Sequence, residues 1–166
     1  MDAKSETIVI QWTSEGGLEQ PISTLADLTV FADGRVMVGP RFTDGKVVEE
    51  QLSKSDFNAL CNFVFQEKDI WSIDSAALDQ EVKAAASLGA DVRSEANTII
   101  QLEMEAIADA ATTVIRTRLG EREHLVKHYN LLAHAQRYPE IDSLQRLRAI
   151  ELRLLALAKQ VANAAR

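Results

Sequence analysis

The strongest pattern of apolar and polar positions lies in residues 52–65. The apolar members recur at helical spacing and share one face of a helix: Phe57, Leu60, Cys61, Val64 and Phe65. Ser53 stands before this stripe as an N-cap, and Asp56 places a carboxylate in the positive first turn. The pattern predicts a capped helix that ends within residues 66–69 and lies on a flat apolar surface.

Two β-rich runs, residues 25–32 and 35–39, flank Asp33-Gly34 and predict a hairpin. A two-residue turn would pair Phe31 with Val36 and make both faces of the hairpin apolar. One face would carry Leu28, Val30 and Met37, and the other would carry Phe31, Val36 and Val38. An antiparallel sheet with one side in water normally has one polar face. Either both faces are covered within the chain, or one of them meets a partner.

Further strands are predicted from β-rich runs at residues 7–12, 46–51 and 98–102. A second hairpin, residues 111–119 and 122–129, turns at Gly120-Glu121. Its cross-strand pairs are Arg118 with Glu123, Ile115 with Val126, and Thr113 with His128. This register predicts one apolar face and one charged face, the charged face carrying Arg116, Arg118, Glu123 and Lys127.

Two more helices follow from composition and spacing. An alanine-rich segment at about residues 74–88 predicts a helix that ends at Gly89. Pro139 begins a last helix that extends to about Asn163. Its apolar stripe is spaced close to a heptad seam: Leu144, Leu147, Ile150, Leu154, Leu157 and Val161, widened by Leu152 and Leu155.

Together these elements predict an α+β fold in one domain, residues 1–166. An antiparallel sheet built from two strand–hairpin groups would carry helices packed on one face. The order also predicts an internal strand–hairpin–helix repeat, with halves at residues 7–69 and 97–163 joined by the alanine-rich helix at about 74–88. The repeat rests on the similarity of the runs at residues 7–11 and 98–101.

Composition is that of an ordinary globular chain, with 46% apolar and 26% charged residues. The net charge of −7 argues against a nucleic-acid partner, because phosphate binding needs a clustered basic surface. No apolar run reaches the length of about 18 residues that a membrane span needs. As written, the polar start predicts a cytoplasmic protein, and an exported mature domain whose leader was replaced by Met1 would carry the same residues. Cys61 alone forms no internal disulfide and lies on an apolar helical stripe.

Candidate chemistry is sparse. His124 and His128 share a strand face but stand about 13 Å apart, too far to bind one metal. We expect His124 to face solvent, and His128 can approach His134 only if the chain turns at Asn130. No glycine-rich phosphate loop or nucleophile elbow is present. The sequence therefore predicts no catalytic residue, no metal and no cofactor.

Three stretches together resemble a group of small uncharacterised bacterial α+β proteins, many of them exported or lipid-anchored. They are residues 28–36, with Leu-Thr-Val-Phe-Ala-Asp-Gly-Arg-Val, the capped helix, and residues 111–124 about Gly120-Glu121. The resemblance covers the larger part of the chain and rests on turns and caps. It implies an α+β fold, and no activity can be carried over from it.

Two functional hypotheses remain open. The first is a non-catalytic interaction or structural module that binds a protein partner or a second copy of itself, through an interface drawn from Phe31, Val36, Val38, Leu152, Leu154 and Leu155. The second is a small-ligand carrier or enzyme with a pocket between sheet and helices, drawn from Trp12, Trp71, His128 and His134.

Overall fold

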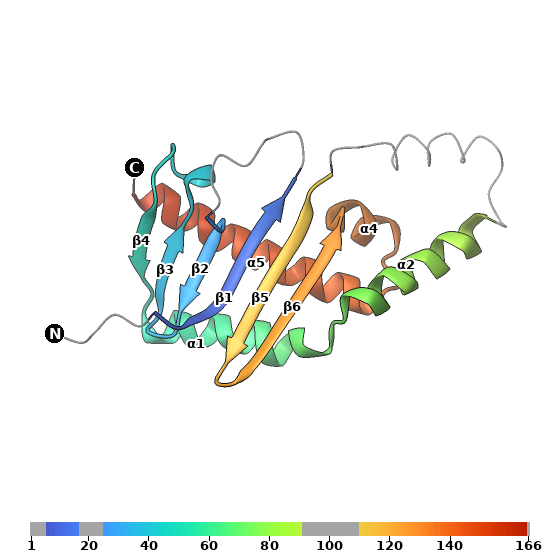
Figure 1. The fold of residues 1–166 in the computed structure, drawn as a ribbon, viewed down its shortest axis with the longest axis horizontal. Coiled ribbons are helices and arrows are strands. Elements are labelled where there is room, and N and C mark those ends of the chain that lie inside the picture. Colours follow the sequence, from blue (N-terminus) through green and yellow to red (C-terminus); the bar gives the residue numbers. More distant parts are fainter. Residues whose placement is uncertain (1–5, 17–24, 91–109, 166) are drawn as a thin grey trace.

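The computed structural model describes residues 6–16, 25–90 and 110–165. Six antiparallel strands form one sheet in the order β4-β3-β2-β1-β5-β6, and helices pack against it in the predicted α+β class (Figure 1). The strands are β1 (Ile8–Glu15), β2 (Leu28–Phe31), β3 (Arg35–Val38), β4 (Val48–Gln51), β5 (Thr112–Leu119) and β6 (Arg122–Tyr129). Strand β1 joins the two hairpins, because it pairs with β2 on one side and with β5 on the other.

The described helices are α1 (Lys54–Asn62), α2 (Ser75–Ala90), α4 (Leu131–Arg137) and α5 (Asp142–Ala164). Helix α1 continues into a π-helical turn, η2 (Phe63–Glu67), and the chain also forms short 3-10 turns η1 (Pro40–Phe42) and η3 (Ile70–Ser72). Figure 1 shows α1 and α5 behind the sheet, on one of its two faces, while α2 and α4 lie toward the β6 side. Among the described helices, none has the length and apolar character needed to cross a membrane.

One hydrophobic core fills the space between the sheet and the helices. The strands contribute side chains with no exposed surface, Ile10, Leu28, Val30, Val36, Val38 and Ile115. Helix α5 contributes Leu144, Leu147, Ile150, Leu154 and Val161 of the predicted stripe, and Ala158 beside them, while the predicted Leu157 is only partly buried. Each fully buried aliphatic side chain stabilises the fold by about 1.5–3 kcal/mol. The stripe of α5 is therefore used to cover the sheet.

The predicted cap of α1 is confirmed. The Ser53 hydroxyl oxygen accepts a hydrogen bond from the backbone N–H of Asp56 at 3.1 Å. The helical segment ends with η2 at Glu67, inside the predicted range, and Asp69 then takes a left-handed backbone conformation with φ of 41°. A local sequence signal was sufficient here because every contact of the cap lies within four residues.

The register predicted for the first hairpin is wrong by one residue. Val30 pairs with Val36 and Thr29 with Met37, because the loop holds three residues and not two. Gly34 adopts φ of 82° after a turn in which its N–H donates to the carbonyl of Phe31 at 3.0 Å. This is the three-residue hairpin loop with a left-handed glycine. A shift of one residue moves every side chain to the opposite face, so Val36 and Val38 enter the core.

The second hairpin has the predicted register, with Arg118 opposite Glu123, Ile115 opposite Val126, and Thr113 opposite His128. Helix α5 begins at Asp142, three residues after the predicted start, and α2 continues through Gly89 to Ala90. Helix α4 was not predicted. It follows Asn130, which has a left-handed backbone with φ of 52° and turns the chain back after β6.

The strand predicted at residues 98–102 lies outside the described residues. It is the first strand of the proposed second repeat half. The internal repeat therefore stays a prediction.

Candidate functional site

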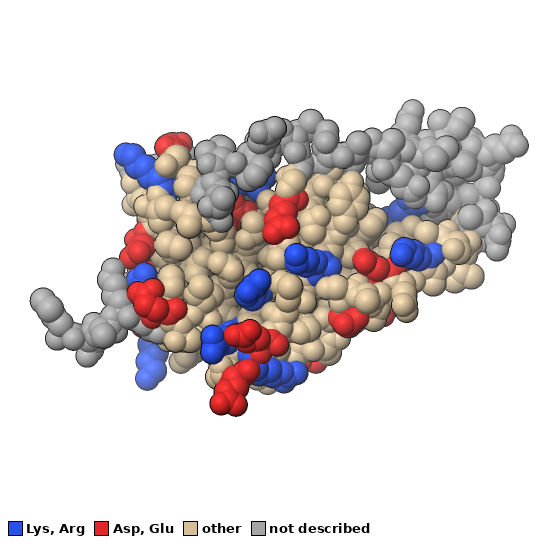
Figure 2. Space-filling view, in the orientation of Figure 1, with Lys and Arg blue, Asp and Glu red and all other residues tan. Residues whose placement is uncertain are grey.

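The face of the sheet that points away from α1 and α5 is the candidate site, and we call it the open face. No described helix covers it (Figure 1). Figure 2 views the molecule from this side and shows charged side chains separated by uncharged ones. The register places five of its side chains, one from each of β4, β3, β2, β1 and β5, in a row across the sheet: Glu49, Met37, Thr29, Gln11 and Arg116. Leu125 of β6 completes that row.

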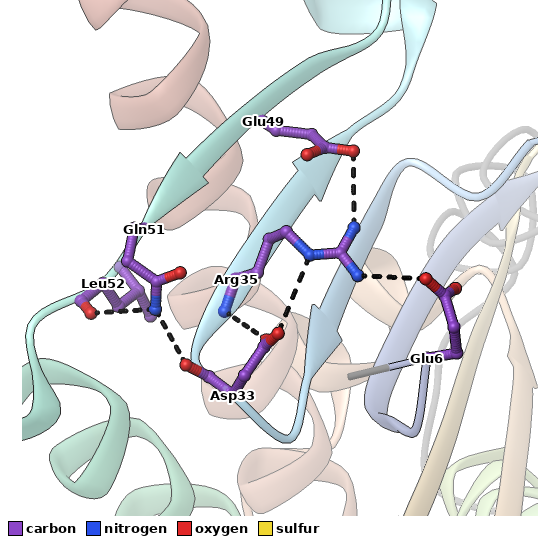
Figure 3. Close-up of polar contacts among 6 residues, drawn as sticks. All are labelled: Glu6, Asp33, Arg35, Glu49, Gln51 and Leu52. Atoms are coloured by element: carbon purple, nitrogen blue, oxygen red, sulfur yellow. Dashed lines mark hydrogen bonds and ion pairs between the residues drawn. The ribbon is translucent and has the colours of Figure 1, made fainter. Parts of the chain in front are cut away.

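Arg35 organises the part of the open face formed by β2, β3 and β4. Its guanidinium carbon lies 3.9 Å from the centroid of the Phe31 ring. Figure 3 shows its nitrogens directed at three carboxylates, Glu49 at 3.3 Å, Glu6 at 3.7 Å and Asp33 at 3.9 Å. We call Glu6, Asp33, Arg35 and Glu49 the acidic half, because one cation there faces three carboxylates.

The loop geometry holds this cluster in place. The backbone N–H of Arg35 donates to the Asp33 carboxylate at 3.0 Å, which fixes the three-residue loop. The Gln51 side chain donates to the carbonyl of Asp33 at 2.8 Å and so ties β4 to the same loop (Figure 3). Arg35 is 8% exposed, so its side chain is buried among these neighbours and does not extend into solvent.

The other end of the open face, on β5 and β6, has the opposite charge. We call Arg116, Arg118, Glu123 and Lys127 the basic half, because three cations there accompany one carboxylate. Arg118 and Glu123 pair at 3.3 Å, with both side chains more than half exposed. Within the described residues, Arg116 makes no ion pair or hydrogen bond through its side chain. Apolar surface lies beside these charges, with Leu125 41% and Tyr129 46% exposed.

A hollow of about 390 Å³ lies between the two halves, lined by Glu6, Thr7, Ile8, Gln11, Arg116, Thr117, Arg118 and Glu123. Two arginines and two glutamates face it, so its charges balance. Small-ligand pockets are mostly apolar with a few polar groups placed to fix one orientation. The balanced rim and open shape suit a polypeptide surface better than a small anion.

Most residues predicted to form an interface lie in the core of the chain itself. Val36, Val38 and Leu154 have no exposed surface, and Leu155 is partly buried against the core. Phe31 lies on the open face but is 5% exposed, because Arg35 covers its ring. Leu152 on α5 is the exposed member of the set, at 47%. Fewer apolar side chains therefore remain for an interface than the sequence predicted, because the three-residue hairpin loop and the packing of α5 place most of them in the core.

The four residues of the predicted pocket belong to three clusters. Trp12 is 3% exposed and packs beside Phe42 with ring centroids 6.0 Å apart. Trp71 stacks on Phe65 at 5.2 Å. The chain does turn at Asn130, and this brings His128 and His134 together.

Buried His128 lies between α2 and α4. Its Nε2 is 2.9 Å from Nδ1 of His134, and its Nδ1 is 3.2 Å from a carboxylate oxygen of Asp79. Burial lowers the pKa of His128, and the neighbouring His134 lowers it further, while Asp79 opposes both effects. One N–H hydrogen bond can join the two neutral imidazole rings, between Nε2 of His128 and Nδ1 of His134. Together with the Asp79 contact, it links β6 to α4 and to α2. Within the described part of the chain, no group of three or more His, Cys, Asp or Glu is arranged to hold a metal ion.

The expectation that His124 faces solvent is wrong. Its Nε2 lies 2.9 Å from the carbonyl oxygen of Ile73, and its ring lies 6.0 Å from that of Trp71. His124 therefore shares the inner face of β6 with Val126 and His128 and helps to fix the segment between η3 and α2.

Two further titratable groups are internal. Burial raises the pKa of Asp27, which accepts a hydrogen bond from the Ser14 N–H at 2.7 Å and lies 3.4 Å from Arg41. Burial also raises the pKa of the Cys61 thiol, which keeps it protonated and unreactive.

Sequence reasoning missed Arg35 and Asp79. A three-residue loop would have placed Arg35 opposite Phe31 and so on the outer face, but Asp33-Gly34 fits both loop lengths. Asp79 meets His128 across 49 residues, and no local pattern signals such a contact.

No protein-family model matches the chain, and no curated protein and no solved structure match it either.

Proposed function

We propose that this chain is a non-catalytic protein-interaction module and that the open face is its binding surface. One observation carries the proposal: a six-stranded sheet has helices on one face, while its other face combines apolar side chains with separated acidic and basic halves. A sheet face that only met water would be expected to be polar throughout.

The chemistry of the face defines the partner. Leu125 and Tyr129 are large apolar side chains that remain 41% and 46% exposed, on either side of Lys127 along β6. The partner would present a flat polypeptide surface with basic groups over the acidic half and acidic groups over the basic half. Such complementarity steers association and selects the partner.

The catalytic alternative has less support. Buried His128 contacts the half-buried His134 and also Asp79, which connects β6 to α4 and α2, and Trp12 and Trp71 lie in separate clusters. The hollow on the open face is bounded by balanced charges, which a polypeptide can match along its length.

Lysine footprinting tests the proposal without a known partner. Lys127 lies exposed on the open face, and Lys159 lies exposed on α5. We expect an amine reagent to label Lys127 more slowly in concentrated lysate of the source cells than in dilute purified protein. Lys159 should be labelled at the same rate in both. Equal labelling of Lys127 in both samples would show that nothing occupies the open face and would refute the proposal.

A further inference from the structure

We infer that the occupant of the open face is a second copy of this chain, packed face to face about a two-fold axis. The inference rests on the proposed function, because it names the partner for the same surface. It starts from the distribution of charge. The acidic half places Glu6, Asp33 and Glu49 around Arg35, and the basic half places Arg116, Arg118 and Lys127 with Glu123.

Arg35 and Glu49 of the acidic half lie on β3 and β4, and the basic half lies on β5 and β6, at the other end of the strand order. Asp33 lies in the loop before β3, and Glu6 lies just before β1, at the hollow between the two halves. A two-fold axis parallel to the strands, placed in the interface between β1 and β2, reverses this order in the second copy. Strands β5 and β6 of each copy then lie over β3 and β4 of the other, which is the isologous arrangement of a closed dimer.

The register supports this superposition. Glu49 and Leu125 stand at the two ends of one row across the sheet, so the axis brings Glu49 of one copy over Leu125 of the other. Arg116 is the cross-strand neighbour of Leu125, and Lys127 is two residues along β6. Each Glu49 therefore meets the two cations that flank Leu125. Packed sheets stand about 10 Å apart, a distance that these long side chains can bridge.

The area fits a reversible dimer. Six strands at a spacing of about 4.8 Å, each rising about 3.4 Å per residue over four to eight residues, present about 600 Å² per copy. Two copies would bury about 1,200 Å², the lower end of specific interfaces. Association should therefore depend on concentration, and because it is directed by charge it should weaken as salt is added.

Charge reversal in two complementary variants tests the arrangement. The first carries Arg116→Glu with Lys127→Glu, and the second carries Glu6→Lys with Glu49→Lys. Arg153→Glu with Lys159→Glu reverses one arginine and one lysine on the exposed surface of α5 and serves as the matched control. Sedimentation equilibrium over a concentration series follows the weight-average mass. Thermal denaturation confirms that each variant is folded, and Glu49→Gln replaces the second variant if that variant unfolds.

Wild-type protein should pass from 18.4 kDa toward twice that mass as concentration rises, and the α5 control should behave in the same way. Each open-face variant alone should have its dissociation constant raised at least about tenfold, because like charges then face each other. An equimolar mixture of the two open-face variants should recover association, since Glu49→Lys of one variant then faces Arg116→Glu and Lys127→Glu of the other. Glu49→Gln should weaken association less than the reversal does.

Three results would overturn the inference: a wild-type mass of one chain at every concentration, variants that associate as wild type does, or a mixture that fails to recover. If the wild type stays a single chain while Lys127 is still protected in lysate, the second copy is excluded and the open face binds a different protein. If Lys127 is not protected either, the proposed function also fails.

Discussion

Replacing Arg35 with alanine should destabilise the fold far more than the same change at Arg118, although both arginines lie on the open face. Arg35 is 8% exposed, stacks on Phe31 at 3.9 Å and lies within 4 Å of three carboxylates. A cation over an aromatic ring contributes about 0.5–2 kcal/mol, and each partly exposed ion pair contributes about 0.2–1 kcal/mol. Loss of the packed aliphatic stem adds to these terms.

These contributions sum to about 1–5 kcal/mol, and we expect Arg35→Ala to lower the free energy of unfolding by about 2–3 kcal/mol, near the middle of that range. Arg118 has one ion pair, in which its side chain is 52% and that of Glu123 is 61% exposed. Arg118→Ala should therefore cost about 0.5 kcal/mol or less. Arg35→Lys should recover part of the loss, since it keeps the charge but lacks the planar fork that stacks on the ring.

Urea denaturation of the three variants at low salt and at 1 M salt measures these effects. The slope with urea should stay constant, which shows that stability and not compactness has changed. Exposed pairs are largely screened at 1 M salt, where the Debye length is about 3 Å, whereas packing on Phe31 is not. Equal losses for Arg35→Ala and Arg118→Ala, or a loss at Arg35 that disappears in salt, would refute the role assigned to Arg35.

Three other changes test the fold. Gly39→Ala should cost about 2 kcal/mol in urea denaturation, because a Cβ there would stand 2.4 Å from the carbonyl oxygen of Ala26, and full stability would contradict the close contact. Since the pKa of His128 is lowered, unfolding takes up a proton as pH falls below about 6.5, so stability should drop there in the wild type and stay level in His128→Gln. Leu154→Asp should unfold the protein as followed by circular dichroism, whereas Leu152→Asp should change stability by about 0.5 kcal/mol or less, because Leu154 is buried and Leu152 is 47% exposed.

Local signals in the sequence were reliable where the deciding contacts are also local. The Ser53 cap needs only residues up to Asp56, and the second hairpin needs only Gly120-Glu121 and the pairing of Arg118 with Glu123. Both were predicted correctly. The α5 stripe was also predicted, and its burial follows from its period.

Nonlocal contacts decided the features that the sequence did not reveal. Trp12 lies within β1, and η1 brings Phe42 beside it. His124 lies on the inner face because the segment after η3 presents the carbonyl of Ile73 to it, 51 residues away. Neither contact leaves a periodic pattern in the sequence, so single-sequence reasoning could not place these side chains.

The one-residue change in the first hairpin also changes the kind of interface to expect. With a two-residue turn, Phe31, Val36 and Val38 would form an apolar surface, and association would be driven by hydrophobic burial. The three-residue loop instead puts Val36 and Val38 in the core and covers Phe31 with Arg35. What remains on the open face is a charge pattern with apolar side chains concentrated near β6. An interface built on this surface gains specificity from the order of its charges, and reversing that order is therefore a stronger test than removing any one apolar side chain.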